Sequence, residues 1–150
     1  MRFDHGEFIS PQTVADCPDG RHSFVPDYVR GVATFDMGSG AVRWISTKGR
    51  FALGGIDGLY CRGTLLIAVQ NGTAPKRAIV LHLDALKSVI TAETVIERST
   101  RTLDLPTHGV FVGATFFYIA NSGWDGLDEH GARIPSIHVS PAIIMRVDGI

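Results

Sequence analysis

One residue pattern recurs three times in this 150-residue chain, and it limits the possible folds more than any other feature. In each copy a short segment leads through a glycine-containing turn into a mostly apolar run. Thr13, Gly58 and Gly109 hold equivalent places in the three copies, which are therefore spaced by roughly 45 and 51 residues. A repeat of about 40–50 residues with about four short strands is typical of a β-propeller blade.

Between these positions lie short runs rich in Val, Ile and aromatic side chains, separated by Gly, Pro, Asp and Ser. Such runs predict β-strands, and they cover residues 31–36, 41–46, 64–69, 77–84, 115–120 and 143–147. Residues 89–97 are also compatible with a helix, but their β-branched side chains favour a strand. We therefore expect an all-β chain of about three four-stranded antiparallel blades, at residues 10–54, 55–104 and 105–150. An independent β-sandwich binding module is the alternative.

Charge and hydropathy exclude several classes of protein. The 14 Lys and Arg residues balance 15 Asp and Glu residues, whereas a general nucleic-acid-binding protein carries a basic excess. No apolar run approaches the roughly 18 residues that a membrane-spanning helix needs. Residues 1–7 include acidic side chains where a signal peptide has an apolar region. We expect a cytoplasmic protein that binds neither nucleic acid nor a membrane.

The two cysteines, Cys17 and Cys61, form no CxxC pair and no disulfide framework. Because free cysteines are commonly buried, we expect two small thiols that are buried or half-buried. The motifs GxSxG, HExxH, GxGxxG and the P-loop do not occur in the sequence. Hydrolysis by a serine nucleophile is therefore unsupported.

Four short motifs occur in order at the blade spacing: Pro-Asp-Gly at 18–20, Val-Pro-Asp-Tyr-Val-Arg-Gly at 25–31, Gly-Ile-Asp-Gly-Leu-Tyr at 55–60 and Tyr-Ile-Ala-Asn-Ser-Gly-Trp-Asp at 118–125. Together they resemble the six-bladed propellers of the senescence-marker-protein/gluconolactonase-like superfamily and its NHL-like relatives. Proteins of that family are about twice as long, so the resemblance implies the three C-terminal blades, a half-ring. A homodimer that closes the ring would cover its open faces; a truncated or degenerate gene product is the other interpretation.

The resemblance also implies a site. Propeller sites surround the channel where the inner strands begin, and Gln12, Asp57 and His108 hold those places here. Gluconolactonase-like enzymes bind one divalent, calcium-like cation through Glu, Asn and Asp oxygens, and the metal polarises the lactone carbonyl and positions water. By this resemblance Asp57 is a metal ligand and a catalytic residue, His108 is a catalytic acid or base, and Gln12 contacts the substrate near the place of the family's asparagine. A turn role for Asp57 and a structural role for His108 are the alternatives.

Two further candidates, Asn121 and Trp124, follow the apolar run of the third repeat. Either they form a substrate-facing rim, or Asn121 forms a turn and Trp124 packs between blades. The implied function is metal-dependent hydrolysis of a small lactone or ester. The alternative is a non-catalytic propeller segment that binds a ligand or a protein, or an inactive remnant. The sequence leaves open whether the protein is an enzyme.

Overall fold

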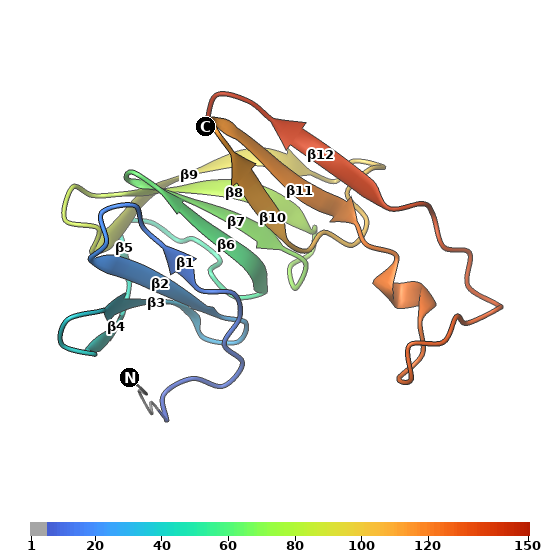
Figure 1. The fold of residues 1–150 in the computed structure, drawn as a ribbon, viewed down its shortest axis with the longest axis horizontal. Helices are drawn as coiled ribbons and strands as arrows, with labels where there is room; N and C mark the ends of the chain where they lie inside the picture. The colour runs from blue at the N-terminus through green and yellow to red at the C-terminus, as the bar shows by residue number, and fades with distance from the viewer. Residues whose placement is uncertain (1–5) are drawn as a thin grey trace.

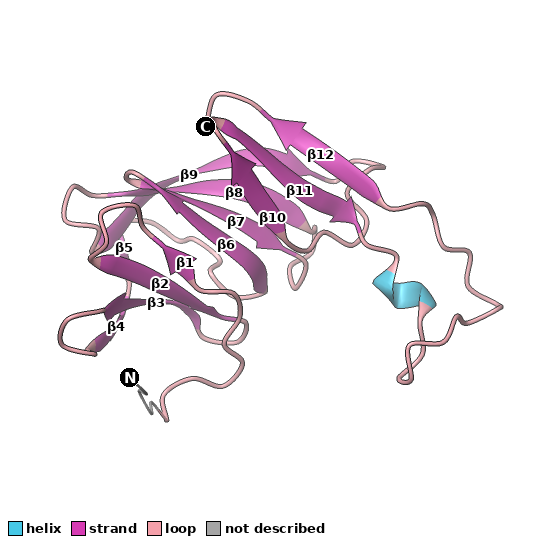
Figure 2. Cartoon of the chain, in the orientation of Figure 1, coloured by secondary structure: helices cyan, strands magenta, loops and turns pink. Residues whose placement is uncertain are grey.

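The computed structural model describes residues 6–150 and shows an all-β protein, which confirms the predicted fold class (Figure 1). Three sheets follow one another along the chain, and the sheet that contains β6 to β9 lies between the other two (Figure 1). The only helical element among the described residues is a single 3-10 turn, η1 (Trp124–Gly126), drawn in cyan in Figure 2.

Apart from β5, strands that follow one another within a sheet are also neighbours in that sheet. The first sheet contains β1 (Ala15–Asp16), β2 (His22–Asp27), β3 (Gly31–Asp36) and β4 (Val42–Trp44). The middle sheet contains β6 (Ile56–Arg62), β7 (Leu65–Gln70), β8 (Arg77–Leu83), β9 (Val89–Arg98) and, at the far edge, β5 (Ser46–Thr47). The third sheet contains β10 (Gly109–Val112), β11 (Thr115–Asn121) and β12 (Ile143–Val147). All pairings are antiparallel except that of β5 with β9, and residues 89–97 belong to a strand as favoured.

The sequence repeat corresponds to a repeated turn. Gly63 lies between β6 and β7 and Gly113 between β10 and β11, with φ angles of 60° and 61°. Gly20, with a φ of 66°, lies in the turn between β1 and β2. Glycine adopts these left-handed angles without the steric cost that a side chain adds. The three sheets therefore begin with the same turn chemistry.

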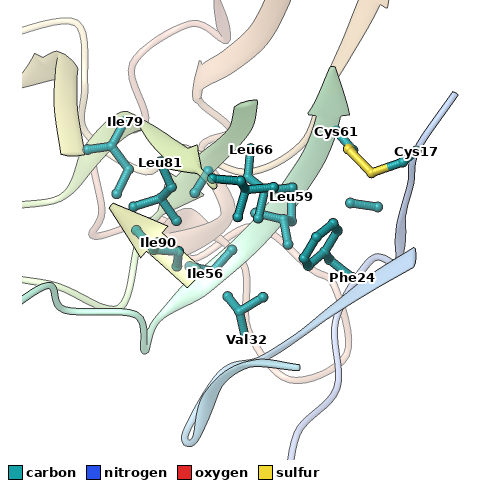
Figure 3. Close-up of a cluster of buried hydrophobic side chains, with 13 residues drawn as sticks. Cys17, Phe24, Val32, Ile56, Leu59, Cys61, Leu66, Ile79, Leu81 and Ile90 are labelled. Atoms are coloured by element: carbon teal, nitrogen blue, oxygen red, sulfur yellow. A yellow bond between two sulfur atoms is a disulfide. The ribbon is translucent and has the colours of Figure 1, made fainter. Parts of the chain in front are cut away.

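Two hydrophobic cores lie on opposite faces of the middle sheet. Side chains of β7 alternate between them, so that Leu66 belongs to the first core and Ile67 to the second. The first core includes Phe24 and Val32 of the first sheet (Figure 3), and the second includes Phe116 of the third sheet. The continuous apolar run of β7 predicted a strand buried on both faces, and this prediction is confirmed.

Cys17 and Cys61 are not free thiols, so this prediction is wrong. They form a disulfide that joins the first sheet to β6 of the middle sheet (Figure 3). Their Cα atoms lie 5.0 Å apart, although 44 residues separate them in the sequence. Both are buried as expected, but their pairing depends on how two sheets pack, which the spacing along the chain does not reveal.

Two observations concern the predicted location. Disulfides are rare in cytosolic proteins, so the Cys17–Cys61 bond argues against a cytoplasmic location. Among residues 6–150 there is no helix with the length and apolar character needed to cross a membrane. The expectation that residues 1–7 are not part of a signal peptide rests partly on residues 1–5, which lie outside the described residues.

The third sheet has an apolar face that no other sheet covers within residues 6–150. Val110, Val112 and Ile144 line a shallow groove on it and are 54%, 62% and 69% exposed. In the middle sheet, by contrast, the face that carries Ile67 and Val69 is covered by the third sheet. Closure of a ring by a second copy of the chain stays a prediction.

Candidate functional site

A cavity of about 590 Å³ lies where β6 and β10 begin and where β2, β7 and β11 end. We call it the central cavity, and its wall consists of Tyr28, Asp57, Asn71, Leu105, Thr107, His108, Ile119, Ser122, Trp124 and Asp125. All three sheets contribute: Tyr28 follows β2, Asp57 lies in β6, and His108 precedes β10. The structure thus brings together three of the predicted site residues, Asp57, His108 and Trp124.

Asp57 lies at a break in the pairing of β6. Ile56 pairs with Gln70 and Gly58 pairs with Val69, which leaves Asp57 without a partner on β7. Such a β-bulge bends the strand and redirects the side chain of the extra residue. At this bulge the Asp57 carboxylate lines the central cavity, while Ile56 and Gly58 on either side are buried.

Asp57 belongs to a chain of three hydrogen-bonded side chains. The Tyr28 hydroxyl donates to Asn71 Oδ1 at 2.8 Å, and Asn71 Nδ2 donates to Asp57 Oδ2 at 3.0 Å. Burial raises the pKa of Tyr28, and the negative charge of Asp57 raises it further, so the hydroxyl keeps its proton at neutral pH. The chain fixes the amide of Asn71 and holds the carboxylate of Asp57 in place.

Two glycines allow this chain of side chains to form. Gly55 N donates to Tyr28 O at 2.7 Å, and Gly72 N donates to Gly55 O at 3.2 Å, which brings three backbone segments together. A Cβ on Gly72 would lie 2.6 Å from the Tyr28 hydroxyl, and a Cβ on Gly55 would lie 2.7 Å from the backbone of Gly72. A side chain at Gly72 would therefore clash with Tyr28, and a side chain at Gly55 would clash with the backbone of Gly72.

His108 reaches the central cavity from the segment before β10. Its backbone O accepts a hydrogen bond from Ile119 N at 2.9 Å, and the N–H of Gly109 donates to the Tyr60 hydroxyl at 2.6 Å. His108 Nδ1 lies 3.5 Å from Thr13 Oγ1, although 95 residues separate them. Within residues 6–150 no hydrogen bond engages Nε2 of His108, so this nitrogen is available to a ligand. The contact with Thr13 brings the first and third repeats together beside the second.

Trp124 and Asp125 stand at the rim of the cavity, on η1. Trp124 is 72% exposed, so it does not pack between sheets. Asn121 is buried; its Oδ1 accepts from Gly123 N at 3.2 Å and its Nδ2 donates to Pro141 O at 3.3 Å. Asn121 thus ties together the two ends of the loop that carries Trp124, and it is not among the lining residues.

Gln12, the remaining predicted residue, does not line the cavity either, because its Nε2 donates to Ser10 Oγ at 3.2 Å. The structure instead places the amide of Asn71 beside Asp57. Tyr28 and Asn71 are the site residues that the sequence analysis missed. A signal was present, because Asn71 ends the apolar run of the second repeat just as Asn121 ends that of the third.

The central cavity offers few ligands for a metal ion. Calcium takes about six to eight oxygen ligands, whereas the only lining carboxylates are Asp57 and Asp125. The Asp57 Oδ2 and Asn71 Oδ1 atoms already accept hydrogen bonds. Among residues 6–150, no three His, Cys, Asp or Glu side chains lie close enough together to hold a metal ion. These side chains do not form a calcium site by themselves, and the role of Asp57 as a metal ligand stays a prediction.

Comparison with known protein families and with curated proteins finds no match to this chain. The likeness to gluconolactonase-like propellers therefore rests on the short sequence motifs alone. The cavity itself supplies a carboxylate held by an amide, an imidazole beside a hydroxyl, and an exposed indole at the rim. Such a set of groups can bind a small polar ligand and can accept a proton at Asp57 or His108.

Proposed function

We propose that the chain is a segment of a gluconolactonase-like propeller and that its central cavity binds and hydrolyses a small lactone or ester. The observation that carries this proposal is the shared cavity of Asp57 and His108, two groups that can accept a proton. The volume of about 590 Å³ lies within the range of small-molecule sites. The consecutive antiparallel sheets and their equivalent glycine turns support the propeller part of the proposal.

In the proposed reaction, His108 is the general base. A water oxygen forms a bond to the carbonyl carbon while one water proton passes to His108 Nε2, which has no other partner within residues 6–150. The bond from the carbonyl carbon to the leaving oxygen then breaks, and that oxygen takes the proton from His108. The Asp57 carboxylate, held by Asn71, stabilises the positive charge that the imidazole carries between the two steps.

The resemblance implies a divalent cation held at Asp57, but within residues 6–150 the wall of the cavity offers too few oxygen ligands for calcium, so no step of this scheme uses one. The steps at His108 do not depend on such an ion. Activity measured with calcium chloride and with a chelator therefore separates this scheme from a metal-dependent one.

The test is the hydrolysis of simple lactones and acetate esters by the purified chain. We expect His108→Gln to lower kcat/KM at least about 100-fold and Asp57→Asn about ten-fold, without loss of β-sheet circular dichroism. His130→Gln is the matched control, because the His130 side chain is 80% exposed and does not line the cavity. Equal activity of the parent and all three variants, or no turnover of any substrate by the folded parent, would contradict the proposal.

A non-catalytic binding site is the second candidate function. It is favoured by the hydrogen-bonding partner of His108 Nδ1, which is a threonine hydroxyl at 3.5 Å and not a carboxylate that accepts a hydrogen bond from the imidazole. No hydrogen bond joins Asp57 to His108 in the part of the chain that the structure describes. Ligand binding without turnover in the assay above would select this function.

A further inference from the structure

We propose that the central cavity recognises a small organic cation, so that its ligand carries an ammonium group. This inference rests on the proposed use of the central cavity as the binding site. It does not require that the ligand be hydrolysed. It follows from the charge of the wall and from the aromatic side chains that border it.

The wall of the central cavity is acidic, although the whole chain is nearly neutral. Among residues 6–150 its lining includes the carboxylates of Asp57 and Asp125 and the imidazole of His108, but no Lys or Arg, whereas the chain contains 14 basic and 15 acidic residues. Neither carboxylate has a Lys, Arg or His ion-pair partner within residues 6–150. A cation in the cavity would meet uncompensated negative charge, and an anion would be repelled.

Two aromatic side chains border the same space. Trp124 is 72% exposed at the rim, and Tyr28 lines the wall beside Asn71. Cations are attracted to the faces of such rings, most strongly to the face of Trp. The cavity therefore combines the two features that bind ammonium groups, carboxylates for the charge and aromatic faces for the attached carbon atoms.

Two other aromatic rings, those of Trp44 and Phe111, each have an arginine as a cation partner. The guanidinium of Arg30 lies 5.3 Å from the ring centroid of Trp44, and that of Arg62 lies 5.3 Å from the ring centroid of Phe111. Trp124 has no such partner among the described residues. Its ring borders the acidic cavity and can contact a cationic ligand.

The charge of the ligand also fits the proposed hydrolysis. Cleavage of an ester that carries an ammonium group on its alcohol part leaves a cationic alcohol and a carboxylate. Asp57 and Asp125 attract the first product and repel the second. The carboxylate product would leave the cavity first, and the cationic alcohol would act as a competitive inhibitor.

The test compares choline with its neutral isostere, 3,3-dimethylbutan-1-ol, at constant ionic strength. The chain has two tryptophans, so Trp44→Phe leaves Trp124 as the only indole reporter of binding. We expect choline to change its fluorescence with a Kd at least about ten-fold lower than that of the neutral alcohol. Calorimetric titration of the unsubstituted protein repeats the comparison without any substitution.

Charge-removing variants locate the effect. Asp57→Asn together with Asp125→Asn is expected to reduce the preference for choline to about two-fold or less, with little change for the neutral alcohol. Glu129→Gln is the matched control, since it removes one negative charge from an exposed side chain outside the cavity. It should keep the full preference.

Equal affinity for the two probes overturns the inference, as does a preference that survives the double variant. A response to calcium chloride but not to choline also overturns it, because the carboxylates would then serve a metal ion. A preference for choline without hydrolysis of any ester supports the inference while the catalytic part of the proposed function fails. Hydrolysis of neutral lactones without binding of choline overturns the inference and supports the catalytic part of the proposed function.

Discussion

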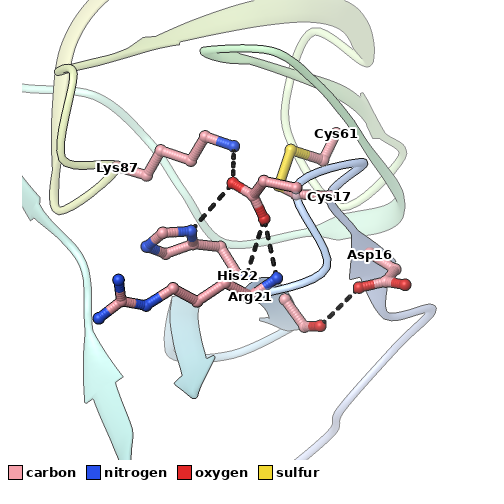
Figure 4. A network of polar contacts seen from close by, with 8 residues as sticks. Asp16, Cys17, Arg21, His22, Cys61 and Lys87 are labelled. Atoms are coloured by element: carbon pink, nitrogen blue, oxygen red, sulfur yellow. Dashed lines mark hydrogen bonds and ion pairs between the residues drawn. A yellow bond between two sulfur atoms is a disulfide. The ribbon is translucent and has the colours of Figure 1, made fainter. Parts of the chain in front are cut away.

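The two faces of the middle sheet are covered in different ways. We call the contact between the first and middle sheets the first junction, and the contact between the middle and third sheets the second junction. The first junction combines a largely aliphatic core with the Cys17–Cys61 disulfide. Next to the disulfide, Lys87 of the middle sheet's β8–β9 turn forms an ion pair with Asp19 of the first sheet's β1–β2 turn (Figure 4).

The second junction has no covalent link in the described part of the chain. It relies on aromatic rings, with centroids of Tyr60 and Phe111 each 5.1 Å from that of Phe116. Hydroxyl groups of the same region make hydrogen bonds across the junction: the Tyr60 hydroxyl accepts from Gly109 N, and the Tyr118 hydroxyl donates to Glu97.

The difference shows that neighbouring sheets of one chain can be held together by two kinds of interaction. It also matters for the central cavity, because Tyr28 comes from the first sheet and His108 from the third. Each junction therefore positions one side of the cavity against Asp57 in the middle. Substitutions at one junction should therefore first displace the side of the central cavity that this junction positions.

The largest expected effect is the loss of the disulfide. In the chain-entropy model, a cross-link between residues 44 apart stabilises a fold by about 4 kcal/mol. We expect Cys17→Ala with Cys61→Ala to lower the free energy of unfolding by about this amount in urea denaturation. Hydrogen exchange should become faster for the amides of β1 and β2 than for those of β10 and β11.

Phe24→Leu provides a control for the first junction, because it changes the same core without removing a cross-link. It should lower the free energy of unfolding by much less, about 1 kcal/mol. Two results would mean that the disulfide does not account for the difference between the junctions. In the first, the double cysteine variant loses no more free energy of unfolding than Phe24→Leu does; in the second, it shows equally fast hydrogen exchange at both junctions.

At the second junction, the bond from Tyr118 to Glu97 has the next largest expected effect. Tyr118 is 1% exposed, and Glu97 also accepts hydrogen bonds from Thr100 and Thr102. Hydrogen bonds to charged groups contribute about 1.5–3 kcal/mol. We therefore expect Tyr118→Phe to lower the free energy of unfolding by about 2 kcal/mol.

A double-mutant cycle of Tyr118→Phe with Glu97→Gln measures the coupling between these two side chains. A coupling free energy near zero would mean that the aromatic packing alone holds the second junction. Tyr28→Phe is the matched control, because it removes a tyrosine hydroxyl at the first sheet's side of the cavity, away from Glu97.

The sequence predicts the elements of this molecule better than it predicts their contacts. The strands at residues 31–36 and 143–147 follow from local alternation and turn residues, and the structure has them at the predicted bounds. Local propensity suffices to place these strands, but it does not reveal that the strand at 143–147 pairs with β11 across the long segment 122–142. The disulfide was missed because it depends on contact between two sheets.

The candidate site divides in the same way. Asp57 and His108 were predicted from their places at the starts of inner strands, and the structure puts both in one cavity. Asn71 was missed although it ends the apolar run of the second repeat, because its hydrogen bond to Asp57 joins the end of β7 to the start of β6 and is formed only on pairing of the two strands. Gln12 was assigned by analogy in position, but a nearby serine hydroxyl competes for its amide.

The smallest expected effect is that of the Lys87–Asp19 ion pair at the first junction. The Lys87 side chain is 10% exposed and that of Asp19 is 34% exposed, so solvent screens the pair in part. We expect Lys87→Met, which keeps the aliphatic stem, to lower the free energy of unfolding by about 1 kcal/mol or less at pH 7. Arg43→Met, at an exposed residue of the same sheet region, is the matched control and should change it less.

The pH dependence of this effect distinguishes an ion pair from packing. Lys87, together with the backbone N–H groups of Arg21 and His22, holds the pKa of Asp19 well below its ordinary value of 3.8. A carboxylate whose pKa is lower in the folded state adds stability above its unfolded-state pKa, and that stability is lost as the pH falls through the folded-state pKa. The difference between the parent and Lys87→Met should therefore be constant from pH 7 to about pH 4 and should shrink in more acidic solution. A difference that does not depend on pH would mean that Lys87 stabilises the first junction through its aliphatic stem, in which case both junctions are held mainly by packing and only the disulfide separates them.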